Sequence, residues 1–175
     1  MAGATFNTPV GNPIARKMLV ACLNVGDSET PEWAVLGRRV EDSSAEYDWG
    51  EESTTDILGE TRTTYKEPTI TQTFDPWTLD ASDKAQLKVW EQSIKKHDTG
   101  AMANNDMLII HKYVGTADTA MFAERYTACA VKPSSLGGSA TVDMPIDVTY
   151  GGTWTTGTVA ISAGKITFTP DDEGT

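Results

Sequence analysis

The segment TRTTYKEPTITQTFDPW, residues 61–77, predicts a β-strand with one polar face, because its side chains alternate in character at a period of two. Ile70 and Phe74 lie on the apolar face, and Pro68 favours an edge position or a bulge. The other face carries side chains that all bear a hydroxyl group: Thr63, Tyr65, Thr69, Thr71 and Thr73. A strand face of this kind has to border water or a water-filled space.

The preceding stretch, EDSSAEYDWGEESTTDILGE (residues 41–60), is strongly acidic and contains no Lys, Arg or His. The chain has a formal net charge of −11, and much of that excess lies here. A run of like charges is most often a solvated surface loop, and this one has no clear strand period. It also contains apolar side chains, which are typical of a segment that becomes ordered against a partner: Tyr47, Trp49, Ile57 and Leu58.

The segment that follows, DASDKAQLKVWEQSIKKH, predicts an α-helix over about residues 81–97. Leu87, Trp90 and Ile94 recur at helical spacing, with acids at the start and lysines at the end, and Gly100 provides a stop. The other apolar segments read as strands: residues 16–24, 32–40, 107–114, 121–132, 141–150, 154–162 and 165–170. The expected fold is therefore mainly β, a β-sandwich or barrel with one packed helix.

A chain of 175 residues is long enough for one stable domain. We expect an extended N-terminal arm over residues 1–15, where Pro9, Gly11 and Pro13 interrupt regular structure. A single domain would then cover residues 16–170, with a long acidic connection at 41–66, and residues 171–175 would form a C-terminal tail.

The sequence shows little sign of catalytic or metal chemistry. Cys22 and Cys129 lie in apolar runs, which predicts buried free thiols in a reducing compartment. The acidic stretch lacks the ligand spacing of a calcium loop, and His97 and His111 have no partner ligand at zinc-site spacing. There is no nucleophile elbow or phosphate loop. We therefore expect no enzyme activity, no cofactor and no metal.

The sequence also gives no indication of a nucleic-acid-binding or membrane-inserting protein. Specific binding to phosphates needs clustered Lys and Arg, and the chain offers only isolated pairs, such as those at residues 38–39 and 95–96. No window approaches eighteen apolar residues, so we expect neither a signal peptide nor membrane insertion by this chain.

Two other functional classes stay open at this point. An adhesin or carbohydrate-binding module with a β-sandwich fold would use exposed aromatic rings such as Trp33, Trp49 or Trp154 as stacking platforms. A glycoside hydrolase would use a pair of acids, which can come from anywhere in the chain.

The order of these parts resembles the major tail tube proteins of long-tailed bacteriophages, over roughly residues 15–170. The resemblance rests on the arrangement and on the phrases YDWGEES (residues 47–53), ILGE (57–60) and TQTFDP (71–76). It implies a β-sandwich with a flanking helix that forms hexameric rings, which stack into a hollow tube through which DNA passes. Tubes of contractile phages and of bacterial secretion systems look similar in fold.

The resemblance also implies partners and a location. The subunit would assemble in the bacterial host cytoplasm, end in the virion tail, and meet other tail proteins such as the tape measure and the terminator. The family has no catalytic residues, and the connection at residues 41–66 would contact neighbouring subunits.

A conduit for DNA should not bind its cargo, and an acidic or hydroxyl-lined wall meets that need because duplex DNA carries about one negative charge per 1.7 Å. We expect Asp48, Glu51, Glu52 and Asp56 to make the lumen electronegative. The full set of candidates for the lumen or for subunit contacts is Tyr47, Asp48, Trp49, Glu51, Glu52, Asp56, Ile57, Leu58, Thr63, Thr69, Thr71 and Thr73.

Overall fold

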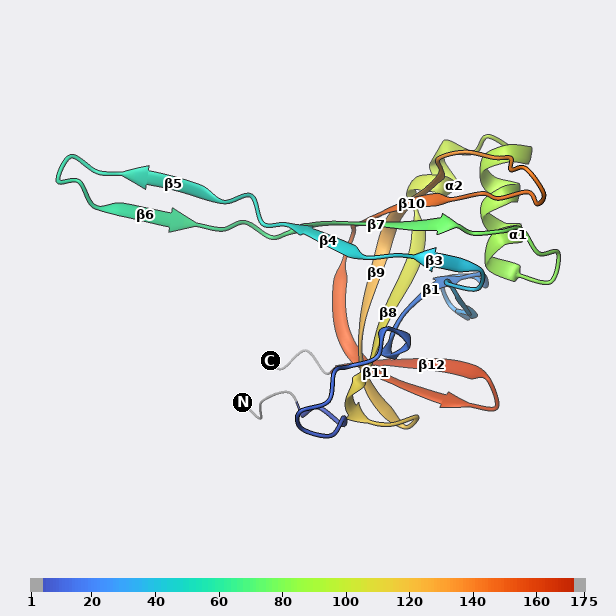
Figure 1. The fold of residues 1–175 in the computed structure, drawn as a ribbon, viewed down its shortest axis with the longest axis horizontal. Coiled ribbons are helices and arrows are strands. Elements are labelled where there is room, and N and C mark those ends of the chain that lie inside the picture. Colours follow the sequence, from blue (N-terminus) through green and yellow to red (C-terminus); the bar gives the residue numbers. More distant parts are fainter. Residues whose placement is uncertain (1–4, 172–175) are drawn as a thin grey trace.

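The computed structural model describes residues 5–171 and is mainly β, with one helical layer packed on a curled sheet (Figure 1). This confirms the predicted fold class. Parts of both predicted terminal segments, residues 1–4 and 172–175, lie outside the described residues. The strands are β1 (Leu19–Asn24), β2 (Trp33–Val35), β3 (Val40–Asp42), β4 (Ala45–Asp48), β5 (Glu52–Thr55), β6 (Thr61–Thr64), β7 (Thr69–Pro76), β8 (Asn105–Thr116), β9 (Ala120–Pro133), β10 (Ile146–Tyr150), β11 (Trp154–Ser162) and β12 (Lys165–Pro170).

The main sheet is antiparallel, and its strands follow the order β2-β1-β8-β9-β10-β7-β3, with β4 also pairing with β7. Strand β9 joins its two halves. Residues 121–126 of β9 pair with β11, which in turn pairs with β12, whereas residues 130–133 pair with β10. Because the long central strands exchange neighbours along their length, the sheet curls instead of remaining flat (Figure 1).

Two hydrophobic clusters cover the two faces of the central strands. On β8, Met107 and Ile109 belong to the larger cluster, while Leu108 and Ile110 belong to the smaller one. Strand β1 divides its side chains in the same way, so its apolar run is buried on both sides, as its sequence predicts.

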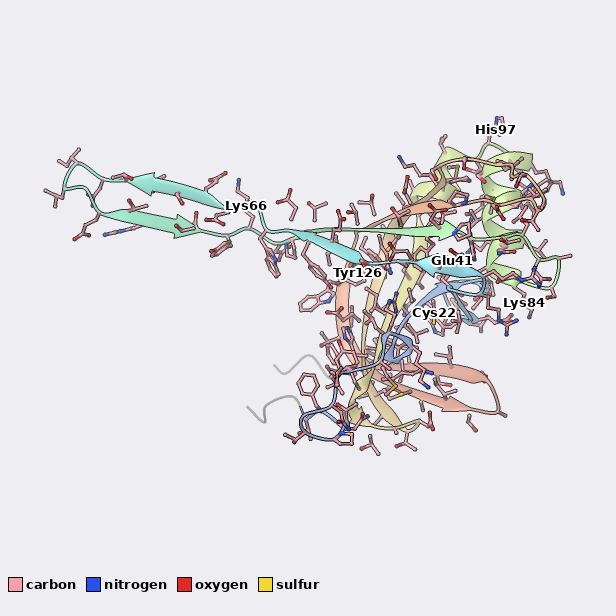
Figure 2. All side chains as sticks on the ribbon, in the orientation of Figure 1. Cys22, Glu41, Lys66, Lys84, His97 and Tyr126 are labelled. Atoms are coloured by element: carbon pink, nitrogen blue, oxygen red, sulfur yellow. The ribbon has the colours of Figure 1, made fainter. Side chains whose placement is uncertain are left out.

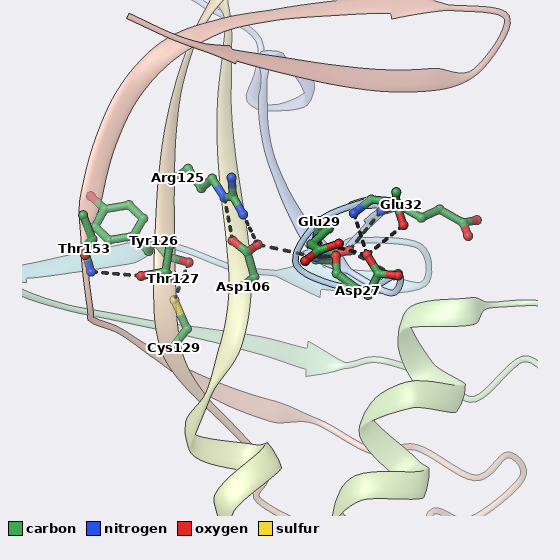
Figure 3. A network of polar contacts seen from close by, with 12 residues as sticks. Asp27, Glu29, Glu32, Asp106, Arg125, Tyr126, Thr127, Cys129 and Thr153 are labelled. Atoms are coloured by element: carbon green, nitrogen blue, oxygen red, sulfur yellow. Dashed lines mark hydrogen bonds and ion pairs between the residues drawn. The ribbon is translucent and has the colours of Figure 1, made fainter. Parts of the chain in front are cut away.

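A polar network fastens the β1–β2 turn to the sheet (Figure 3). The guanidinium of Arg125 on β9 donates to both carboxylate oxygens of Asp106 on β8, at 3.0 and 2.6 Å, and lies 5.8 Å from the ring centroid of Trp33. These bidentate hydrogen bonds raise the pKa of Arg125. The Asn24 amide donates to Asp106 and accepts from the Gly26 and Glu32 amides, which fixes the path of the turn.

The helical layer consists of α1 (Lys84–Trp90), a π-helical continuation η2 (Glu91–Lys95) and the short α2 (Thr99–Ala103). The Asp83 carboxylate caps α1 by accepting from the Ala85 and Gln86 amides, an interaction that stabilises a helix by about 1 kcal/mol. The predicted stop at Gly100 is wrong, because the chain leaves the helix at His97, whose φ is +49°, and Gly100 lies within α2.

The predicted apolar face of this helix is also largely wrong. The residues that α1 and η2 bury are Ala85, Gln86, Val89 and Ser93. Of the predicted stripe, Ile94 packs against the core, but Leu87 is 49% exposed and Trp90 is 37% exposed. The helix therefore carries a second, uncovered apolar face.

The acidic stretch contains strands, in contrast to the irregular connection expected for it. Strand β3 and strand β4 both pair with β7, and β5 pairs only with β6. The predicted long strand over residues 61–77 is accordingly divided into β6 and β7 by residues 65–68, which are not in a strand. Strands β5 and β6 form a ribbon that projects far from the body of the protein (Figure 1).

Candidate functional site

The exposed face of β7 is polar, as predicted, and adjacent strands extend it. Along β7, exposed and buried residues alternate, with Thr69, Thr71 and Thr73 outward. Thr71 pairs in register with Glu46 of β4 and with Thr149 of β10. We call this surface the polar sheet face; it comprises Glu46, Asp48, Thr69, Thr71, Thr73, Ala130, Lys132, Asp147 and Thr149.

Carboxylates outnumber cations on the polar sheet face. The Thr73 hydroxyl donates to the Asp147 carboxylate at 2.9 Å, and the Lys132 ammonium lies 4.0 Å from the same carboxylate. No large apolar side chain belongs to this set. A neighbouring shallow groove adds further acids from Glu41, Asp42 and Asp75. This surface thus carries short side chains, many hydroxyl groups and a net negative charge.

The reverse side of β7 holds this face in place. Gln72 is buried there, its amide donating to the Ser43 hydroxyl at 2.8 Å and accepting from the Tyr150 hydroxyl at 2.6 Å. Burial raises the pKa of Tyr150 well above its usual value, so the phenol stays a donor. These hydrogen bonds therefore connect β7 to β10 and to the β3–β4 connection.

The second feature is the projecting hairpin, defined here as residues 49–66. Every residue of β5 and β6 is exposed, so the ribbon is stabilised by its own cross-strand contacts. Hydroxyl pairs join Ser53 to Thr63 and Thr55 to Thr61, each at 3.0 Å. Thr63 therefore belongs to the ribbon and not to the polar sheet face.

The tip of the hairpin is an ordered turn that displays two aliphatic side chains. The Asp56 carboxylate accepts from the Leu58 amide at 2.9 Å and from the Glu60 amide at 3.0 Å, and Gly59 takes a φ of +82°. Ile57 is 101% exposed and Leu58 is 82% exposed. The turn thus presents an apolar pair in a fixed geometry.

At the root of the hairpin, aromatic and charged groups stiffen the ribbon. The rings of Tyr47 and Trp49 stack with centroids 6.1 Å apart, and the Lys66 amide donates to the Trp49 carbonyl at 2.9 Å. The Lys66 ammonium also forms an ion pair with the Glu52 carboxylate. Glu51 is exposed beside them.

The predicted acids are therefore dispersed. Only Asp48 lies on the polar sheet face; Glu51 and Glu52 are at the root of the hairpin, and Asp56 shapes the tip. Sequence reasoning missed Glu46, Asp147 and Thr149. The sequence of β10 does contain a signal for Asp147 and Thr149. Apolar residues alternate with them along the strand, and because the apolar residues are buried, Asp147 and Thr149 must lie on the opposite face.

Features of other functional classes are sparse in the described part of the chain. Burial raises the pKa of both the Cys22 and Cys129 thiols to about 12, which removes them as nucleophiles near neutral pH. Trp33 is only 7% exposed, so it cannot serve as a sugar-stacking platform, although Trp49 and Trp154 are exposed. Between residues 5 and 171 no group of three or more His, Cys, Asp or Glu is placed to hold a metal ion.

Within the same residues, the helices are all too short or too polar to cross a membrane.

No protein-family model and no curated protein matches the chain. Among solved structures, it is similar to a chain of the PVC sheath/tube terminator of an extracellular contractile injection system in the extended state, with a TM-score of 0.51 and 11% identity over 85% of this chain and 99% of that one. A chain of the sheath-tube complex of that system gives a TM-score of 0.49 at 12% identity, covering 86% of this chain and 95% of that one.

A chain of the anti-feeding prophage cap, described as the tube-terminating cap, gives a TM-score of 0.48 at 15% identity, over 87% of this chain and 95% of that one. At these identities, the likeness to the sheath/tube terminator chain shows a tail-tube-like fold and nothing about shared binding or activity.

Proposed function

We propose that this chain is a non-enzymatic structural subunit of a phage tail tube. It associates with copies of itself into hexameric rings, and the rings stack into a hollow conduit for DNA. In the virion tail it meets other tail proteins, including the tape measure and the terminator, after assembly in the bacterial host cytoplasm. The similarity of fold to a sheath/tube terminator chain supports this proposal.

The observation that carries the proposal is the projecting hairpin. An isolated two-stranded ribbon is marginally stable in water, and this one exposes all its strand residues together with Ile57 and Leu58. Such a ribbon gains further stabilisation by packing on another molecule. A protruding element that docks on a different surface of an identical copy makes a head-to-tail contact, which generates rings or filaments.

The polar sheet face suits the wall of the conduit. Its threonines and carboxylates offer DNA few cations, so few counterions are released when DNA comes near and little binding free energy is gained. In this arrangement Asp48, Thr69, Thr71 and Thr73 border the lumen. The remaining predicted residues on the hairpin and at its root contact neighbouring subunits: Tyr47, Trp49, Glu51, Glu52, Asp56, Ile57, Leu58 and Thr63.

Light scattering coupled to size exclusion tests the proposed self-association. Across a concentration series of the purified chain, we expect the mean mass to rise from a single subunit to multi-subunit assemblies, because burial of the hairpin tip depends on a second copy. A mass equal to one subunit at every concentration, also after addition of the other tail proteins, would refute the proposal.

A further inference from the structure

The uncovered face of the helix lies next to a groove with a mixed polar and apolar lining. Leu87 is exposed on α1, and a groove beside it runs between the helix and the β1–β2 turn, where Val25 and Gly26 line it. Trp90 is exposed one helical turn further along, because residues at i and i+3 are neighbours on a helix surface. Two partly exposed apolar side chains and a groove thus occupy one surface.

The acids of this surface compensate its cations unevenly. Four lysines lie along the helix, at positions 84, 88, 95 and 96. Lys84 forms an ion pair with Glu32, whereas Lys95 and Lys96 share the single carboxylate of Glu91. The Lys88 ammonium donates to a backbone carbonyl, that of Asn24, and also senses the charge of the Asp106 carboxylate. Lys95 and Lys96 are therefore the lysines of this face that carry more charge than the carboxylate they share.

The tip of the projecting hairpin has the complementary composition. Ile57 and Leu58 form an apolar pair, and the acids Asp56 and Glu60 flank them. The carboxylate of Asp56 is held by the turn, so the geometry of the tip is set before it meets a partner. A preorganised contact loses less conformational entropy on binding than a flexible one does.

The two surfaces lie at opposite ends of the molecule. In Figure 1 the tip of the β5–β6 ribbon and helix α1 mark the two ends of the long axis, and in Figure 2 Lys66 at the hairpin root is likewise remote from Lys84 on the helix. A hairpin cannot fold back to reach its own helix, so only a second copy can bring the two surfaces together.

We propose that the hairpin tip of one copy docks on the helix face of a neighbouring copy. Ile57 and Leu58 enter the surface formed by Leu87, Trp90 and the adjacent groove, and the acids of the tip meet Lys95 and Lys96. Complementary charge around a buried apolar centre sets the register of such an interface. This inference rests on the proposed self-association and specifies the surface that the tip meets.

A disulfide cross-link tests the contact in the full chain. The variant Leu58→Cys/Leu87→Cys, assembled and then oxidised, should give a ladder of covalent multimers on a non-reducing gel, because each copy carries both partners of a head-to-tail contact. The native thiols do not compete, since Cys22 and Cys129 are both buried. Docked thiols have an effective concentration in the millimolar range, so the yield should exceed that of a non-contacting pair by at least about tenfold.

The matched control is Leu58→Cys/Lys165→Cys, in which the second cysteine lies at the exposed β11–β12 turn. A ladder in the first variant and its loss in the control support docking on the helix. Assemblies seen by light scattering that give equal cross-linking in both variants overturn this inference and leave the proposed self-association standing. A protein that stays monomeric before oxidation overturns both.

A compensating charge reversal adds an independent readout. Glu60→Lys alone and Lys95→Glu/Lys96→Glu alone should each raise the concentration needed for assembly, whereas an equimolar mixture should lower it again, because the reversed tip then meets a reversed helix face. If the mixture assembles no better than either variant alone, the tip meets a different surface.

Discussion

Replacing Glu52–Thr64 by an Asn-Gly turn is expected to abolish self-association and leave the subunit folded. The ribbon pairs only with itself and all its strand residues are exposed, so its removal takes nothing from either hydrophobic cluster. Asn-Gly closes a hairpin readily. We expect the free energy of unfolding to stay within about 0.5 kcal/mol of the parent value, as for surface changes in general.

A smaller change separates the tip from the rest of the ribbon. In Ile57→Ser/Leu58→Ser, two exposed aliphatic side chains lose the apolar surface that docking would bury. Burying each is worth about 1.5–3 kcal/mol, so at least about 3 kcal/mol is lost per contact. The concentration needed for assembly should rise by at least about a hundredfold, since each 1.4 kcal/mol corresponds to a factor of ten.

Light scattering and denaturant unfolding measure both quantities on the same samples. Ser53→Ala/Thr63→Ala is a suitable control, because it removes one cross-strand hydroxyl pair of the ribbon and keeps the tip. Normal assembly of the protein without its ribbon would show that the hairpin is not the contact element.

Three lysines on the polar sheet face are expected to convert a passive wall into a DNA-binding one. Thr71, Thr73 and Thr149 are neighbours across β7 and β10, and their replacement by Lys places cations among the carboxylates of this face. Tubes of this variant should retain linear duplex DNA at low salt, whereas parent tubes release it. Retention should fall with salt, with a log–log slope of about −0.9 for each phosphate contacted.

The matched control moves the same charges to another exposed threonine ladder. Thr158→Lys/Thr167→Lys/Thr169→Lys lies on β11 and β12, away from the polar sheet face. Filter retention on assembled tubes is measured with labelled DNA whose ends are open and with labelled DNA whose ends are blocked, because only DNA with open ends can enter a lumen. If the first variant retains blocked DNA as well as open DNA, as the control should, the polar sheet face points away from the lumen.

The sequence was most informative where one side of a strand is buried. The alternation around Thr69, Thr71 and Thr73 predicts the outward face of β7 because Ile70 and Phe74 need a core. The neighbours of those threonines, Glu46, Asp147 and Thr149, depend on strand pairing between distant segments. Pairing of that kind is not encoded in local periodicity, so the full extent of the polar sheet face could not be predicted.

The ribbon was missed because it is exposed on both sides and so has no alternation between apolar and polar positions. A weaker signal was present: β-branched and hydroxyl residues, at 53–55 and at 61, 63 and 64, stand on either side of a turn that begins with Asp56 and contains Gly59. The high density of acids around that signal favoured a solvated loop instead.

The helix was predicted at the correct position in the chain but with the wrong face toward the core. Ala85, Val89 and Ser93 share one face at i, i+4 and i+8, and their small side chains allow close approach to the core. Leu87 and Trp90 satisfy the same periodicity on another face. Core positions usually carry the larger apolar side chains. In a helix with two apolar faces, a choice by side-chain size alone therefore assigns the wrong face to the core when the smaller side chains are the buried ones.

Electron cryo-microscopy of the assembled chain should show hollow tubes of stacked sixfold rings. In these tubes β4, β7 and β10 turn the polar sheet face to the lumen, and each hairpin reaches a neighbouring copy. Assemblies without a central channel, or a channel lined by a different face while the hairpin projects into solvent, would contradict this arrangement.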